Sequence, residues 1–191
     1  RGFTAMSEKH SPEDMVRMLN DYFAVMVDVL FQYGGTLDKY VGDEIIGLFG
    51  APVPTPDAPY RAVRCALDMM KALEEFNRLR DSRGQPPIEI GIGLNTGPVI
   101  AGAIGSSRTL QYTVIGDAVN IASRLCSVAK ASEIIISQST MDRVRQQVSV
   151  EARQPVMVKG KAAALPIYRV VGLRESAGAE ARATQAVPTD R

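Results

Sequence analysis

The segment Lys39-Tyr40-Val41-Gly42-Asp43-Glu44 contains a basic side chain, Lys39, and an acidic side chain, Asp43, that could bind or act on a ligand. Glycine directly before Asp43 predicts a tight turn, where the carboxylate is exposed and the backbone can approach a ligand closely. Lys39 lies four residues earlier, and the turn interrupts the strand alternation that would place it on the same face as Asp43. Two simpler interpretations stay open. Gly-Asp is a common turn dipeptide, and Lys39 can form a surface salt bridge or be solvated.

A second segment holds an amide and a guanidinium at helical spacing. Residues 112–124 read Y-T-V-I-G-D-A-V-N-I-A-S-R, in which Asn120 and Arg124 are four residues apart and share one face of a helix. An arginine fork beside an amide suits recognition of a phosphate and a ribose. The alternative is an amphipathic helix whose polar side faces water, with Asp117 forming a local turn at its start.

Two further segments are less specific. Arg1-Gly2-Phe3-Thr4 places backbone amides after a glycine, which is compatible with a phosphate-binding bend. Residues 158–161 read V-K-G-K, and Lys159 could contact a phosphate or simply belong to a solvated turn.

The composition restricts the chemistry that remains. The 191 residues suffice for one domain, and 22 Lys and Arg against 21 Asp and Glu give a net charge of +1, which disfavours nucleic-acid binding. The single histidine, His10, excludes poly-histidine metal sites, and two distant cysteines exclude a zinc ribbon or a disulfide scaffold. No apolar run approaches the roughly 18–20 residues of a membrane helix. Sparse cysteine predicts a reduced, cytoplasmic domain.

The expected elements alternate between helices and strands. Apolar periodicity predicts helices over residues 12–31, 57–80, 118–128 and 139–146. A hairpin is expected over 36–41 and 44–49, with further strands over 88–94, 110–115, 133–137, 148–158 and 167–173. This order predicts an α+β fold with a ferredoxin-like, split βαβ core sheet and helices on one face. Residues 174–191 lack large apolar residues and are predicted to form a disordered tail.

Taken in order, the segments resemble the catalytic domain of class III nucleotidyl cyclases, the adenylyl and guanylyl cyclases. The matching motifs are R-G-F-T at the start, K-Y-V-G-D-E, G-L-N-T-G at 93–97, Y-T-V-I-G-D-A-V-N-I-A-S-R and V-K-G-K. They span almost everything from residue 1 to 173, which is the expected cyclase domain. Thr113 resembles the bacterial-type subgroup with threonine at the adenine-recognition position, where many members carry aspartate.

The resemblance implies a homodimer with composite sites and two divalent metal ions, Mg²⁺ or Mn²⁺. Asp43 matches one metal-binding aspartate. The other lies two residues before R-G-F-T, upstream of Arg1, so the first strand is expected to be truncated. Phe3 and Thr4 match the segment that contacts the β- and γ-phosphates. The partner protomer would supply the remaining groups: Lys39 and Thr113 to adenine, Asn120 to the ribose, Arg124 to the reacting phosphate and Lys159 to the terminal phosphates.

The implied activity is that of an adenylate cyclase, which converts ATP to cyclic AMP and pyrophosphate. Lys39 favours ATP, because guanylyl cyclases usually carry an acidic residue there. A guanylate cyclase is the near alternative, and a catalytically silent module that senses nucleotide or dimerises is a third hypothesis. The resemblance also predicts upstream regulatory domains.

Overall fold

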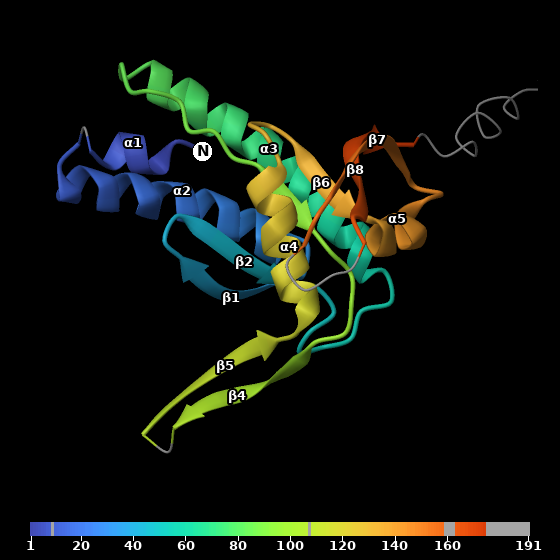
Figure 1. The fold of residues 1–191 in the computed structure, drawn as a ribbon. Helices are drawn as coiled ribbons and strands as arrows, with labels where there is room; N and C mark the ends of the chain where they lie inside the picture. Colours follow the sequence, from blue (N-terminus) through green and yellow to red (C-terminus); the bar gives the residue numbers. More distant parts are fainter. Residues whose placement is uncertain (9, 107, 159–162, 175–191) are drawn as a thin grey trace, which may run out of the picture.

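The computed structural model describes residues 1–8, 10–106, 108–158 and 163–174. In chain order the elements are α1 (Phe3–Ser7), α2 (Pro12–Gln32), β1 (Thr36–Val41), β2 (Glu44–Leu48), α3 (Ala58–Asp81), β3 (Ile92–Leu94), β4 (Ile100–Ser106), β5 (Thr109–Ile115), α4 (Asp117–Val128), β6 (Ile134–Ser137), α5 (Gln138–Val144), β7 (Val148–Val156) and β8 (Leu165–Leu173). The long helices α2 and α3 pack on one another, and β4 and β5 project from the body as an arm (Figure 1).

Local signals explain the two long helices. The Ser11 hydroxyl caps α2 by accepting a hydrogen bond from the Asp14 backbone N–H at 3.1 Å. The buried stripe of α2 then meets that of α3 in two clusters, one around Met26 and Leu73 and the other around Leu30 and Cys65. The hairpin β1–β2 packs against both clusters through Leu37 and Ile45. The hairpin is thereby held on the helix pair.

The main sheet has the order β3-β6-β8-β7, in which β3 and β6 are parallel and the other pairs are antiparallel. The α+β class is confirmed. Helices lie on both faces of this sheet, whereas the sequence predicted one face. Ile134 and Ile136 pack with α3 and α5, while Ile135 points the other way to Leu125 of α4. The cause is β6, whose unbroken apolar run is buried on both sides.

Within the described residues the strands form three sheets, because the hairpin β1–β2 and the arm β4–β5 are not hydrogen-bonded into the main sheet there. The predicted strand over 88–94 is correspondingly shorter and begins at Ile92. Both backbone groups of Ile88 bond to the Asn77 side-chain amide at 2.8 Å, and the Ile90 carbonyl accepts from Ser132 N–H at 2.8 Å. These bonds satisfy both backbone groups of Ile88 and the Ile90 carbonyl without a strand partner.

Strand β4 was not predicted, because its Ile-Ala-Gly-Ala-Ile-Gly-Ser sequence is rich in small residues and largely exposed. Among the described residues no helix is both long and apolar enough to cross a membrane. The predicted tail at 174–191 falls, apart from residue 174, outside the described residues.

Candidate active site

The hairpin turn presents Asp43 to solvent. Val41 pairs with Glu44, so Gly42 and Asp43 form a two-residue turn, and Gly42 has φ +61°, a conformation that favours glycine. The Asp43 side chain is exposed, while the neighbouring Glu44 is half-buried. Burial, with the charge of Asp43 as a smaller cause, raises the pKa of Glu44 above its ordinary value. The turn therefore offers one exposed carboxylate with a second, partly desolvated carboxylate behind it.

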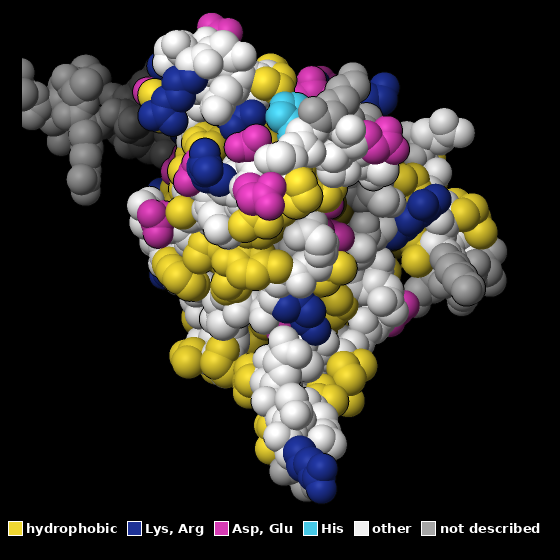
Figure 2. Space-filling model, turned by 90° about the vertical axis from the view of Figure 1, so that its left-hand side faces the viewer, with side chains coloured by type: hydrophobic (Ala, Val, Ile, Leu, Met, Phe, Trp, Pro, Cys, Tyr) yellow, Lys and Arg dark blue, Asp and Glu magenta, His cyan; other side chains and the backbone are white. Residues whose placement is uncertain are grey.

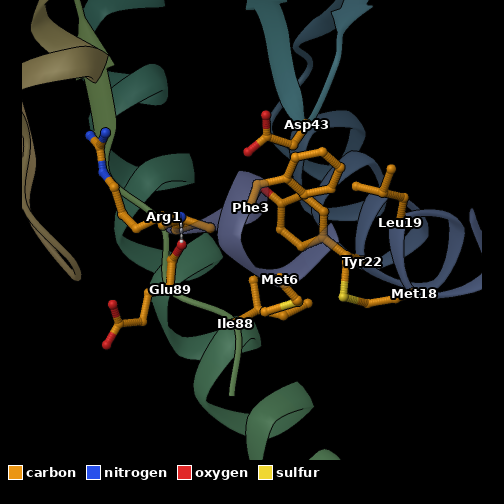
Figure 3. A pocket seen from close by; sticks show the side chains of 10 residues that line it. Arg1, Phe3, Met6, Met18, Leu19, Tyr22, Asp43, Ile88 and Glu89 are labelled. Carbon is orange, nitrogen blue, oxygen red and sulfur yellow. Dashed lines mark hydrogen bonds between the residues drawn. The ribbon is translucent and has the colours of Figure 1, made fainter. Parts of the chain in front are cut away.

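A small pocket of about 40 Å³ joins Asp43 to the first helix. Figure 3 shows Phe3 beside Asp43 at one end of this pocket, while Met6 and Met18 line its apolar end. Phe3 is half-buried, and Thr4 is exposed on α1. Tyr22 completes the wall, and burial raises the pKa of its hydroxyl well above the ordinary value, so the phenol stays neutral. Phe3 and Asp43 thus line the same pocket, and Thr4 follows Phe3 on α1.

Lys39 points away from this group and contacts the arm. Its Nζ donates to the Thr113 Oγ1 at 2.6 Å, across 74 residues of sequence. Thr113 is buried at the base of β5, and Lys39 is partly exposed on β1. The structure therefore brings together the two residues expected to read the purine.

Asn120 and Arg124 lie on the exposed side of α4, one turn apart. The opposite side of this helix is anchored by Leu125, which is fully buried against Ile135 and Ile167. Arg124 Nε donates to the Met157 carbonyl at 3.4 Å, so the guanidinium lies near the segment after β7. Lys159, two residues beyond Met157, lies outside the described residues.

Asp38 contacts both Lys39 and Thr113, although the sequence did not single it out. Its side chain is 1% exposed, and its Oδ2 lies 3.4 Å from Lys39 Nζ and 3.2 Å from Thr113 Oγ1. Strand alternation predicts that neighbours such as Asp38 and Lys39 point to opposite faces. A register shift between Leu37 and Lys39 breaks the alternation and brings both side chains to Thr113. An aspartate directly before the lysine was the available signal, but a bulge is not readable from one sequence.

Large apolar side chains are exposed along the arm. They are Ile100, Ile104, Leu110, Tyr112 and Ile115. Figure 2 shows hydrophobic side chains on both sides of the arm close to the body. Clustered apolar exposure of this kind is typical of an interaction surface.

The described part of the chain contains no preformed cluster of metal ligands. No group of three or more His, Cys, Asp or Glu side chains there is arranged to hold an ion. Asp43 is nevertheless an exposed oxygen donor of the type that Mg²⁺ and Mn²⁺ prefer, so it fits a shared site to which other ligands contribute.

The chain thus forms an α+β domain with an exposed arm, a hairpin carboxylate and a polar face on α4. Residues 1–172 match the family model described as the adenylate and guanylate cyclase catalytic domain, and the chain belongs to that family. Among solved structures, the guanylyl cyclase Cya2 is similar with a TM-score of 0.87 and 40% identity, covering 93% of this chain and 90% of that chain. The adenylyl cyclase CyaB from P. aeruginosa is similar with a TM-score of 0.86 and 34% identity, covering 91% and 90%.

Curated relatives include Adenylate cyclase 1 of Rhizobium meliloti (strain 1021), which is 35% identical over 173 residues, 90% of this chain. An adenylate cyclase of Anabaena cylindrica is 38% identical over 179 residues, 89% of this chain. The chain spans only 26% of the first relative and 35% of the second, so these relatives are larger proteins.

Proposed function

We propose that this domain is an adenylate cyclase, which forms 3′,5′-cyclic AMP and pyrophosphate from ATP. The observation that carries the proposal is the 2.6 Å contact between Lys39 Nζ and Thr113 Oγ1, which sets an ammonium donor beside a hydroxyl. Adenine offers the matching pair, an acceptor at N1 beside a donor at N6. Curated relatives named adenylate cyclases support the same substrate.

The reaction requires positioning and charge stabilisation rather than a protein nucleophile. The ribose 3′-hydroxyl attacks the α-phosphorus in line, its proton is removed, and pyrophosphate leaves. Arg124, exposed on α4, is proposed to stabilise charge on the α-phosphoryl oxygens, and Asn120 to orient the ribose. One positioned donor of this kind contributes roughly 3–4 kcal/mol to transition-state stabilisation.

Asp43 is proposed to bind divalent metal, together with the aspartate that the family pattern places upstream of Arg1. Two Mg²⁺ or Mn²⁺ ions, when bound, activate the attacking hydroxyl and balance charge on the triphosphate. Phe3 lines the same pocket as Asp43, and Phe3 and Thr4 are proposed to contact the β- and γ-phosphates. Lys159 is proposed to reach the terminal phosphates from the other protomer.

The working unit is proposed to be a homodimer with composite sites. The exposed apolar residues of the arm support this, since they need a covering surface. Lys39 contacts Thr113, whereas Phe3 and Asp43 line a pocket to which neither of those two residues belongs, and each protomer is proposed to contribute a different half of a site. Upstream regulatory domains and a cytoplasmic location stay predictions.

The test uses a chain extended upstream of Arg1, incubated with ATP and Mn²⁺, with cyclic AMP and pyrophosphate measured. We expect both products in equal amounts, and their loss on Asp43→Ala or Arg124→Ala. Mixing those two variants should restore about a quarter of the wild-type rate, because only mixed dimers hold one intact site. Arg78→Ala, an exposed residue of α3, is the matched control. No cyclic AMP from a folded, ATP-binding dimer would refute the proposal and favour a silent nucleotide-sensing module.

A guanylate cyclase is the second candidate, because Cya2 is 40% identical to this chain over most of its length. Supplying ATP and GTP together to the same sample and measuring both cyclic products distinguishes the adenylate cyclase from the guanylate cyclase. Preferred turnover of GTP would replace the proposal with this alternative.

A further inference from the structure

A buried carboxylate, that of Asp38, contacts both Lys39 and Thr113, the pair proposed to recognise the purine. The Asp38 side chain is 1% exposed, and its Oδ1 has no hydrogen-bond partner among the described residues. Its other oxygen faces both Lys39 and Thr113. Burying a carboxylate with one oxygen unpaired is unfavourable, and the contacts with Lys39 and Thr113 offset part of that cost. Asp38 is therefore a buried charge that, among the described residues, is matched by Lys39 and Thr113.

The three side chains fix the direction of each hydrogen bond. An ammonium only donates and a carboxylate only accepts. Thr113 Oγ1 therefore accepts from Lys39 Nζ at 2.6 Å and donates its single proton to Asp38 Oδ2 at 3.2 Å. With its proton committed to Asp38, the Thr113 hydroxyl can present only a lone pair to anything else that approaches.

We propose that Asp38 is a specificity-determining positioning residue, which holds the Thr113 hydroxyl as an acceptor and so selects 6-aminopurine over 6-oxopurine nucleotides. This inference rests on the proposed function of the Lys39–Thr113 pair. A 6-amino group donates to the Thr113 lone pair, whereas a 6-oxo group would bring two acceptors together. A free threonine could turn its proton toward either group, so Thr113 alone would discriminate poorly. Asp38 and Thr113 together act as the single acceptor that an aspartate would supply.

The test compares ATP with inosine triphosphate, which differ only at the 6-position and in the protonation of N1. In the upstream-extended chain, the ratio of kcat/KM for ATP to that for inosine triphosphate is measured for wild type, Asp38→Leu and Asp38→Asn. We expect Asp38→Leu, which removes the acceptor, to lower the ratio about tenfold. Asp38→Asn keeps a carbonyl that can accept from Thr113, so it should retain most of the discrimination. Asp38→Val serves as a second acceptor-free variant if the leucine does not fold.

A double-mutant comparison shows whether Asp38 acts through Thr113. In a Thr113→Val background, Asp38→Leu should change the ratio no further. Asp68→Asn is the matched control, since Asp68 also accepts from a hydroxyl and a lysine, those of Tyr33 and Lys71, away from the site. An unchanged ratio in folded Asp38→Leu, or an equal drop in the Thr113→Val background, overturns the inference. A wild type that forms no cyclic AMP from ATP refutes instead the proposed function.

Discussion

Gly93 on β3 lies so close to α4 that replacing it with alanine should displace that helix. A Cβ there would lie 2.1 Å from the Cys126 nitrogen, 2.5 Å from the Ala122 oxygen and 2.7 Å from the Leu125 carbonyl carbon. The first of these contacts is 1.3 Å shorter than the 3.4 Å at which ordinary contact begins. All three atoms are main chain, so no rotamer change relieves the clash. The helix or the strand must shift by about 1 Å.

The displacement has two measurable consequences. Overpacking of this kind costs about 1–3 kcal/mol, which lowers the melting temperature by roughly 3–10 °C for a domain of this size. Because α4 carries Asn120 and Arg124, a misplacement of about 1 Å should also lower kcat on the order of a hundredfold. The Lys39–Thr113 pair lies on β1 and β5, so ATP binding should change far less.

Thermal unfolding of the upstream-extended chain measures the loss of stability. Steady-state kinetics, measured below the melting temperature of the variant, give the change in kcat. The matched control is Gly172→Ala on β8, where a Cβ would meet nothing within 4 Å. It should stay within about 0.5 kcal/mol of wild type. A Gly93→Ala protein that melts and turns over like wild type would refute the argument that β3 and α4 are in backbone contact.

Three further outcomes follow from packing, titration and the arm. Leu125→Ala, at a side chain with no exposure, should cost about 2–5 kcal/mol in denaturant unfolding, and a smaller loss would mean that the site collapses around the cavity. Hydrogen bonds from Lys71 and Tyr33 hold the pKa of Asp68 below its ordinary value. The ionised Asp68 therefore stabilises the folded state above the unfolded-state pKa, and this contribution disappears as pH falls through the folded-state pKa. The melting temperatures of wild type and Asp68→Asn should therefore differ at neutral pH and begin to converge as pH falls below about 4, and parallel curves would contradict this assignment. Leu110→Glu on the arm should weaken dimerisation at least about tenfold in sedimentation experiments while Leu79→Glu on α3 does not, and equal behaviour of the two would remove the arm from the interface.

Elements whose signals are local were predictable from the sequence. The apolar stripes of α2 and α3 and the Gly42-Asp43 turn are decided by neighbouring residues, and each lies where expected. Strand β4 was missed because an exposed arm has no buried face and hence no alternation to detect. The shorter β3 has a different cause, since the side chain of Asn77 takes the backbone hydrogen bonds of Ile88. A hydrogen bond between a side chain and a backbone group far apart in the chain does not alter the apolar periodicity from which strands are predicted.

The chemistry of Thr113 shows the same limit at the site. By residue type, threonine both donates and accepts, so its place in a motif leaves open which purine edge it would suit. The direction is decided by a carboxylate 75 residues away in sequence, which reaches the hydroxyl because β1 bulges at Asp38. The bulge depends on how β1 pairs with β2, and the contact depends on how β5 meets β1. The proposed purine selectivity would therefore depend on three elements in contact, and a motif that names Lys39 and Thr113 captures the groups that would touch the base but not the group proposed to orient them.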